Sequence, residues 1–375
     1  MNILFYVISL RPSSGGIERV TYMLSEELVK KGHNCFACYW REEHDQAESQ
    51  HYSSILKEER FDRDSRARVC NFIQQHNIEI VINQFAEDKE VYNLMLSIKE
   101  NTDVKIITAL HQQPKYYENI KTLEALNFLP KSLNSFLYSL IKIRKRKERQ
   151  HLTRQMYVIS DAYVLLSESF FSDFLRYNRI SDKTKLRAIP NPAVTTIPGN
   201  LTKEKALLYV GRLENEQKRV DRVLTIWKEF HSEGDGWKLY IVGDGKDRAI
   251  LETMSRSLNL TDVTFEGFQS HPESFYAKSM IFLMTSDYEG WGMTLIEAMR
   301  YAVVPIAYDT YSSLHDIIED GVNGTIISTS QKNVTSSLKN TIDNYKNLSI
   351  CAQNSISKFS TSEVCNKWLS LINTL

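Results

Sequence analysis

Short apolar runs alternate with amphipathic stretches along most of the chain. Apolar runs of this length are typical of strands buried on both faces of a parallel sheet, and apolar positions at helical spacing lie between them. The first half has expected strands at 2–9, 34–39, 79–82, 104–110, 157–166 and 186–189, and expected helices at 12–31, 64–76 and 89–99. The second half has expected strands at 206–210, 239–245, 263–268, 280–284 and 303–308, and expected helices from about 218 and within 360–375. Such alternation predicts a doubly wound α/β fold, whose ligands bind at the carboxyl ends of the strands.

The pattern is interrupted once, near the middle of the chain. Pro190-Asn191-Pro192 is a stiff break, and the residues from there to Lys205 are rich in Thr and Pro, as in a linker. The chain has 375 residues, more than one hydrophobic core usually serves. We therefore expect two α/β domains that meet at this break.

Residues 280–299 combine a strand, a glycine-containing loop and a helix. This order presents backbone N–H groups and a helix N-terminus to an anion. Two carboxylates flank the loop, Glu289 before its glycines and Glu297 in the first helical turn. The alternative is that Thr294 and Glu297 form a capping box and that Glu289 is an ordinary loop carboxylate.

Other polar or glycine positions also follow expected strands. Gly15-Gly16 would let the backbone approach a phosphate, although a plain tight turn also uses such a pair. Arg212 and Lys218 lie between a strand and a helix, where two cations would meet a diphosphate, unless they are only surface cations. His111 follows the strand at 104–110, where it has either a structural or a ligand-binding role.

The stretch Tyr-Glu-Gly-Trp-Gly-Met-Thr-Leu-Ile-Glu-Ala-Met at 288–299 resembles the signature of the retaining GT-B glycosyltransferases of family 4. Gly-Arg-Leu at 211–213 and Asp-Gly-Val-Asn-Gly at 320–324 resemble further motifs of that family. The resemblance implies two facing Rossmann-like domains with the active cleft between them. It assigns residues 1–190 and a returning helix at 358–375 to an acceptor-side domain, and residues 191–357 to a nucleotide-sugar-binding domain.

The same resemblance implies a role for each motif residue. Glu289 would act on the donor sugar, Glu297 would hold the ribose, and Arg212 and Lys218 would bind the leaving diphosphate, although Arg219 makes the choice of Lys218 ambiguous. His111 would touch either the donor sugar or the acceptor. The further donor contacts would be Gly15, Gly16, Gly243, Gly267, Phe268, Gly290, Trp291, Gly292, Met293 and Thr294, with the Gly15-Gly16 pair facing either the donor diphosphate or the acceptor.

The implied activity is transfer of a sugar from a UDP- or GDP-sugar to an acceptor hydroxyl with retention of configuration. No metal or other cofactor is expected, because GT-B enzymes generally lack the Asp-x-Asp metal site. The alternatives are an epimerase or phosphorylase of the same fold, or a non-catalytic nucleotide-sugar-binding partner of an active transferase. Both glycine-rich turns depart from G-x-G-x-x-G, which disfavours an NAD dehydrogenase.

Residues 128–155 differ from the rest of the first half. An apolar stripe of Leu133, Phe136, Leu137, Leu140 and Ile141 precedes a basic cluster, Lys142, Arg144, Lys145, Arg146, Lys147 and Arg149. This pattern is typical of an amphipathic helix on an anionic membrane surface, although an ordinary surface helix would also fit. It favours a lipid-linked glycan acceptor at the inner face of the cell membrane.

Composition limits the class of partner and the cellular compartment that we expect. Lys plus Arg and Asp plus Glu both number 46, so the global charge predicts no nucleic-acid partner. Five cysteines, an odd number, disfavour a disulfide framework and favour a reducing compartment. No run approaches the roughly 20 apolar residues of a membrane-spanning helix, and we expect a cytoplasmic protein that is at most peripheral to a membrane.

Overall fold

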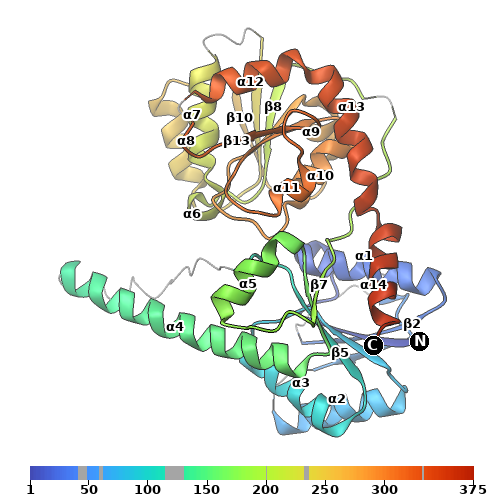
Figure 1. Ribbon diagram of the computed structural model, residues 1–375. Coiled ribbons are helices and arrows are strands. Elements are labelled where there is room, and N and C mark those ends of the chain that lie inside the picture. The colour runs from blue at the N-terminus through green and yellow to red at the C-terminus, as the bar shows by residue number, and fades with distance from the viewer. Residues whose placement is uncertain (41–48, 59–61, 115–130, 200, 232–235, 332) are drawn as a thin grey trace. The chain divides into compact units, whose positions relative to one another are not determined.

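The computed structural model describes residues 1–40, 49–58, 62–114, 131–199, 201–231, 236–331 and 333–375, without the side chains of 131–136 and 138. These residues form two compact units (Figure 1). The first is Met1–Pro190 together with Cys365–Leu375, and the second is Asn191–Val364.

The first unit contains a parallel sheet in the order β3-β2-β1-β4-β5-β6-β7. β1, β4 and β5, in the middle of this sheet, are buried almost throughout because helices cover both faces, which is why they read as continuous apolar runs. The strands are β1 Asn2–Val7, β2 Asn34–Tyr39, β3 Ser54–Lys57, β4 Ile80–Asn83, β5 Lys105–Leu110, β6 Ala162–Leu165 and β7 Leu186–Ala188.

The helices of the first unit begin at recognisable caps. The Asp62 carboxylate accepts a hydrogen bond from the Ser65 N–H at 2.8 Å, and the Asp88 carboxylate accepts one from the Glu90 N–H at 2.7 Å. The helices are α1 Gly16–Lys30, α2 Arg63–Gln75, α3 Lys89–Asn101, α4 Lys131–Ile159 and α5 Phe171–Asn178, with short 3₁₀ turns at Pro12–Ser14 and Glu168–Phe170. The strand expected at 157–166 is wrong over its first residues, because α4 continues to Ile159 and buries Tyr157 on its inner face.

The second unit contains a parallel sheet in the order β10-β9-β8-β11-β12-β13. Its core gathers apolar side chains from the strands around the fully buried Trp227, whose indole N–H donates to the Thr261 carbonyl at 3.0 Å. The strands are β8 Ala206–Val210, β9 Lys238–Val242, β10 Val263–Gly267, β11 Ile281–Met284, β12 Val304–Tyr308 and β13 Thr325–Ile327. The helices are α6 Asn215–Lys218, α7 Val220–His231, α8 Arg248–Ser257, α9 Glu273–Lys278, α10 Met293–Arg300, α11 Leu314–Ile317, α12 Val334–Asp343 and α13 Tyr345–Ser355, with a 3₁₀ turn at Ile356–Phe359. The last helix, α14 Thr361–Ile372, begins in the second unit, and from Cys365 on it belongs to the first.

The strand order reverses once in each sheet, between β1 and β4 in the first and between β8 and β11 in the second. Loops leaving the carboxyl ends of two such strands turn to opposite faces, which opens a crevice where doubly wound proteins bind ligands. The fold therefore singles out the loops after β1 and β4, and the loops after β8 and β11.

The loop after β8 is held in place by the loop after β9. The Gly211 N–H donates to the Val242 carbonyl at 3.0 Å, and the Leu213 N–H donates to the Asp244 carbonyl at 2.9 Å. Gly243 lies in the left-handed region at φ +138°, and a Cβ there would lie 1.9 Å from the Gly211 carbonyl oxygen. Only glycine fits at this crossing of two backbones.

We predict that Gly243→Ala lowers the free energy of unfolding of the second unit by about 4 kcal/mol or more, because a backbone–backbone clash is added to an unfavourable φ. Gly321→Ala is the matched control, since Gly321 also has a positive φ, +72°, but no atom lies within 4 Å of its Cβ position. It should lose only about 1–2 kcal/mol. Chemical denaturation measures both, and equal losses would contradict the proposed clash.

Candidate active site

The loops after β8 and β11 are joined by hydrogen bonds at the point where the strand order reverses. The Asp287 N–H donates to the Gln217 carbonyl at 2.8 Å, and the Gln217 side-chain amide donates to the Tyr288 carbonyl at 3.1 Å. The Thr285 hydroxyl donates to the Lys218 carbonyl at 3.0 Å. Residues about 70 positions apart in sequence are thereby fixed beside each other.

Lys218 and Glu289 form an ion pair across this junction. The Lys218 Nζ lies 2.6 Å from Glu289 Oε1, and the same oxygen accepts a hydrogen bond from the Ser286 hydroxyl at 2.7 Å. Glu289 is only 8% exposed, so its charge depends on these two partners. The structure thus brings together two residues that the sequence assigned to the diphosphate and the donor sugar.

Arg219, the alternative to Lys218, belongs to a different set of contacts. It is in the left-handed conformation at φ 50°, and its guanidinium lies 2.9 Å from Asp221 and 3.2 Å from Asp287. Hydrogen bonds to Asp221 and then Asp287 raise the pKa of Arg219 above its ordinary value. Arg219 therefore ties the start of α7 to the loop after β11, and Lys218 is the residue that faces Glu289.

Arg212 lies on the β8 loop and is 63% exposed. Its guanidinium lies 3.3 Å from the Glu214 carboxylate and 3.1 Å from the Gln217 side-chain oxygen. The Tyr209 hydroxyl donates to the Arg212 carbonyl at 2.9 Å. Burial, and next the nearby Glu289 charge, raise the pKa of Tyr209, so this phenol stays neutral beside the loop.

The N-terminus of α10 directly follows the Glu289 loop. Gly292 is its N-cap at φ +95°, and a Cβ there would lie 3.1 Å from atoms of Leu295 and Tyr311. The capping-box interpretation is therefore wrong, because Thr294 is the second residue of the helix rather than its cap. The Leu295 N–H donates to the Gly292 carbonyl at 2.9 Å. The N–H groups of Met293 and Thr294 come before the first intrahelical acceptor and face the N-terminal end of the helix.

Glu297 lies one turn into α10 and accepts a hydrogen bond from the Tyr276 hydroxyl at 3.1 Å. Trp291 contributes to packing, since it is buried and its ring meets that of Phe359 edge-on, with the ring centroids 5.6 Å apart. Gly290 precedes it, and the Gly290 carbonyl accepts from the Ser313 hydroxyl at 3.4 Å.

At the end of β10, Gly267 is at φ +71° and a Cβ there would lie 3.1 Å from the Arg248 guanidinium. Phe268 follows it and is 75% exposed, an unusual position for a phenylalanine ring. This strand end therefore carries an exposed aromatic ring, directly after a glycine that lies beside Arg248.

In the first unit, the predicted residues lie after β1 and β5. Gly15 is extended rather than left-handed, and a Cβ there would lie 2.5 Å from the Glu18 carboxylate, whereas Gly16 has open space around its Cβ position. The His111 Nε2 lies 2.6 Å from the Gln84 side-chain oxygen, which joins the ends of β5 and β4.

Beside His111 lies a polar cluster that the sequence did not reveal. The largely buried Glu87 carboxylate accepts hydrogen bonds from the Gln112 amide and from Arg149. Burial raises the pKa of Glu87, an effect that Arg149 opposes. Glu87 follows β4 and Gln112 follows β5, so the search for polar residues at strand ends could have found both.

Arg149 therefore differs from the other cations of the basic cluster. Arg144, Lys145, Arg146 and Lys147 are exposed on α4, although Arg144 lies 2.9 Å from Glu148 and Arg146 lies over the Tyr177 ring at 5.1 Å. Leu140 and Ile143 are also exposed on this helix, whereas the side chains of Leu133 and Phe136 are outside the described residues. Within the described parts of the chain, every helix falls short of the length and apolarity needed to cross a membrane.

The described residues contain no group of three or more His, Cys, Asp or Glu side chains that could hold a metal. One Asp-x-Asp tripeptide does occur, Asp62-Arg63-Asp64, but Asp62 is the N-cap of α2. The five cysteines are all free thiols.

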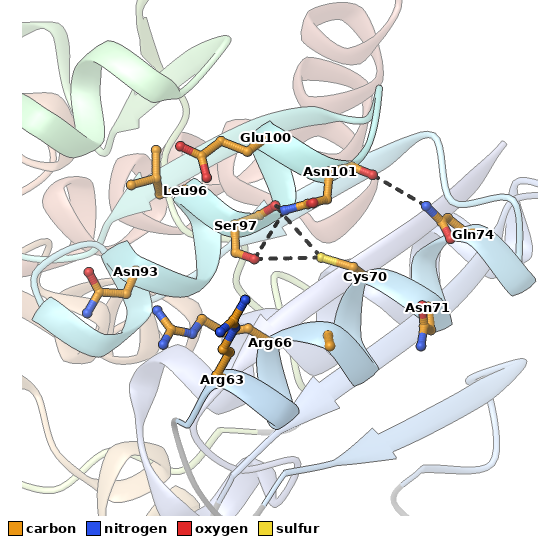
Figure 2. A pocket seen from close by; sticks show the side chains of 11 residues that line it. Arg63, Arg66, Cys70, Asn71, Gln74, Asn93, Leu96, Ser97, Glu100 and Asn101 are labelled. Carbon is orange, nitrogen blue, oxygen red and sulfur yellow. Dashed lines mark hydrogen bonds between the residues drawn. The ribbon is translucent and has the colours of Figure 1, made fainter.

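A groove of about 610 Å³ lies between α2 and α3, away from all the predicted site residues. Figure 2 shows the polar side chains of both helices around it, with Cys70 and Ser97 at its floor. The Cys70 thiol lies 3.8 Å from the Ser97 carbonyl.

Comparison with known proteins identifies the family. The Glycosyltransferase Family 4 model matches residues 14–196, and the Glycosyl transferases group 1 model matches residues 196–358. The lipopolysaccharide 1,6-galactosyltransferase of Escherichia coli (strain K12) is 35% identical over 158 residues, which are 39% of this chain and 43% of that protein. In the first three curated relatives the match spans only 33%, 43% and 40% of their lengths.

Two further proteins match over their whole length. The GalNAc-alpha-(1->4)-GalNAc-alpha-(1->3)-diNAcBac-PP-undecaprenol alpha-1,4-N-acetyl-D-galactosaminyltransferase of Campylobacter jejuni is 24% identical over 385 residues, 99% of this chain and 98% of that protein. The crystal structure of Anabaena Alr3699/HepE in complex with UDP-glucose has a TM-score of 0.73 at 14% identity, and covers 100% of both chains. This second likeness concerns the fold alone.

The two family models together cover residues 14–358, and Lys218 and Glu289 meet where the strand order of the second sheet reverses. The chain belongs to the GT-B glycosyltransferases.

Proposed function

We propose that this protein transfers a sugar, with retention of configuration, from a UDP-sugar to a hydroxyl of a bacterial surface-glycan precursor. The observation that carries the proposal is the contact of Lys218 with Glu289 at the reversal point of the second sheet. The named relatives that act on lipopolysaccharide and on an undecaprenol-linked glycan support the acceptor class, and the UDP-glucose complex of HepE supports the donor class.

Scission of the donor breaks the bond between the anomeric carbon and the diphosphate, and a bond to the acceptor oxygen forms as its proton is released. The growing negative charge on the diphosphate needs preorganised positive partners. Lys218 has three N–H groups, so its pair with Glu289 leaves capacity for a phosphate oxygen. Arg212 and the N-terminus of α10 supply the remaining stabilisation.

The carboxylates have separate tasks in this proposal. Glu289, held by Lys218 and Ser286, accepts hydrogen bonds from hydroxyls of the donor sugar. Glu297, eight residues later and on α10, accepts them from the ribose. Phe268 and the backbone at the end of β10 receive the base.

The reaction requires no metal in this proposal, because two cations and a helix N-terminus already surround the diphosphate. The acceptor binds at the strand ends of the first unit, near Gly15, Gly16 and His111. The exposed cations of α4 hold the protein at an anionic membrane surface, where a lipid-linked acceptor is presented.

Arg212→Ala should lower the rate of sugar transfer about a hundredfold, the scale of losing one preorganised donor to a developing charge. Transfer from UDP-sugars to an undecaprenyl-diphosphate glycan is measured with and without the acceptor. The control is Arg256→Ala, an exposed arginine on α8 whose loss should leave the rate unchanged.

Wild-type protein that binds UDP-sugars but never turns them over would favour a non-catalytic binding partner instead. Turnover to an epimerised sugar nucleotide without any acceptor would favour an epimerase. Normal transfer by Arg212→Ala would contradict the role of that residue.

Chelation should leave transfer intact. We expect unchanged initial rates after treatment with excess EDTA and passage over a chelating resin, because no step in the proposal uses a divalent ion. A loss of transfer that one divalent metal restores would show that a carboxylate near the diphosphate is a metal ligand.

Replacing Arg144, Lys145, Arg146 and Lys147 with Ser should release the protein from anionic liposomes and slow transfer to the lipid-linked acceptor. Each cation near such a surface contributes about 1 kcal/mol of attraction, and the attraction weakens as salt rises. Cosedimentation with phosphatidylglycerol vesicles measures the binding.

The control carries the same change of charge on other exposed cations of the first unit, namely Lys30, Lys57, Arg63 and Lys89. It should stay bound to the vesicles. Equal release of both variants would show that net charge, rather than α4, is responsible. Wild-type protein that ignores the vesicles at low salt would contradict the membrane role.

A further inference from the structure

Tyr276 lies on α9 and is almost completely buried, with 1% of its surface exposed. Its ring stacks on Tyr301 with centroids 5.8 Å apart and an angle of 16° between the planes, and it also packs against Phe282. These contacts need only a flat apolar ring, so a phenylalanine would fill the position equally well. The hydroxyl group therefore needs a separate explanation, since a buried phenol requires a hydrogen-bond partner.

The partner is the Glu297 carboxylate, whose Oε2 accepts the Tyr276 hydroxyl at 3.1 Å. A glutamate side chain has several rotatable bonds and loses much conformational freedom when it is fixed. A bond from a rigid ring to one carboxylate oxygen restricts that freedom before any ligand arrives. A carboxylate held in this way presents its acceptor oxygens to ribose hydroxyls in a defined direction.

We propose that Tyr276 is a positioning residue that holds Glu297 ready to bind the ribose of the donor. The inference rests on the proposed function, because it assigns Glu297 to the ribose. Tyr276 itself touches neither the ribose nor the reacting atoms.

The backbone of α9 is fixed as firmly as the ring. Lys203, from the segment before β8, donates from its Nζ to the carbonyls of Tyr276 at 3.0 Å, Ser279 at 2.7 Å and Tyr301 at 2.5 Å. One lysine side chain, whose pKa is lowered to about 7 by burial, thus caps the C-terminal ends of both α9 and α10. Because Glu297 lies on α10 and Tyr276 on α9, this cap maintains the spacing of the two helices that carry the hydrogen bond.

The test is Tyr276→Phe, which removes one oxygen and keeps the ring contacts. Calorimetry measures the affinities of the purified full-length protein for UDP and for 2′,3′-dideoxyuridine diphosphate, which lacks the hydroxyls that Glu297 would bind. We expect UDP to bind roughly tenfold more weakly, the scale of one hydrogen bond to a charged group. The dideoxy analogue should bind as it does to the wild type.

The ratio of the two affinities is the decisive quantity, because both ligands are measured on one preparation and a loss of folded protein affects them equally. Tyr301→Phe is the matched control, since it removes a hydroxyl from the other ring of the stack without touching Glu297. It should leave the ratio unchanged. Equal weakening of both ligands, or no change, in Tyr276→Phe would overturn the inference.

Glu297→Ala separates this inference from the proposed function. If Glu297→Ala loses the preference for UDP and Tyr276→Phe keeps it, Glu297 binds the ribose without help from Tyr276. If Glu297→Ala also keeps the preference, the ribose assignment itself is wrong. Wild-type protein that binds neither nucleotide would contradict the proposed donor and the inference together.

Discussion

The ion pair between Lys218 and Glu289 connects the two strand ends on which the site of the second unit depends. Its partners are 71 residues apart in sequence and meet because β8 and β11 are neighbours at the point where the strand order reverses. A largely buried carboxylate is costly without a cation, and a largely buried ammonium is costly without an anion. The pair therefore fixes the loop after β8 against the loop after β11, and the diphosphate of the proposed donor would find both already in place.

A second ion pair has the corresponding place in the first unit. Glu87 follows β4, the strand beside the reversal point, and Arg149 reaches it from α4. The same helix carries the exposed cations at 144–147, within about two turns of Arg149. This contact thus sets the direction of the exposed basic segment. It lies at the carboxyl ends of β4 and β5, where His111 and Gln84 also lie. A membrane-bound α4 would be coupled to the acceptor side through this contact.

The apolar pattern was sufficient to predict most strands, because strands buried on both faces are continuously apolar. β2 and β8 begin and end at the predicted residues. The pattern missed β3 and β13, which are edge strands of four and three residues, with few fully buried side chains. It also mistook the end of α4 for a strand, since a short apolar run such as that around Tyr157 fits either structure.

The strand-end rule and the family motifs located Arg212, Lys218 and Glu289, but they could not show which residues contact each other. Ser286, Tyr276 and Lys203 carry no motif, and their importance lies in partners that only the folded chain provides. The capping box failed for a local reason, because Gly292 in the left-handed region already begins the helix. Sequence therefore indicates where the polar groups gather, whereas their pairing depends on the register of strands and helices.

The two cations of the second unit differ in how their charge acts. The Lys218 side chain is 18% exposed and already paired, so its field is weakly screened and its position is fixed before the donor binds. The Arg212 side chain is 63% exposed, and water screens its charge in the free protein. In the proposed reaction, donor binding would expel that water, and the same guanidinium would then interact several times more strongly with a phosphate at equal distance. In the free protein, Glu214 and Gln217 already hold the Arg212 guanidinium in place. Binding would therefore cost this side chain little conformational entropy. In the proposed function, Lys218 would therefore contribute mainly by its fixed position, and Arg212 by a charge whose strength rises when the bound donor excludes water.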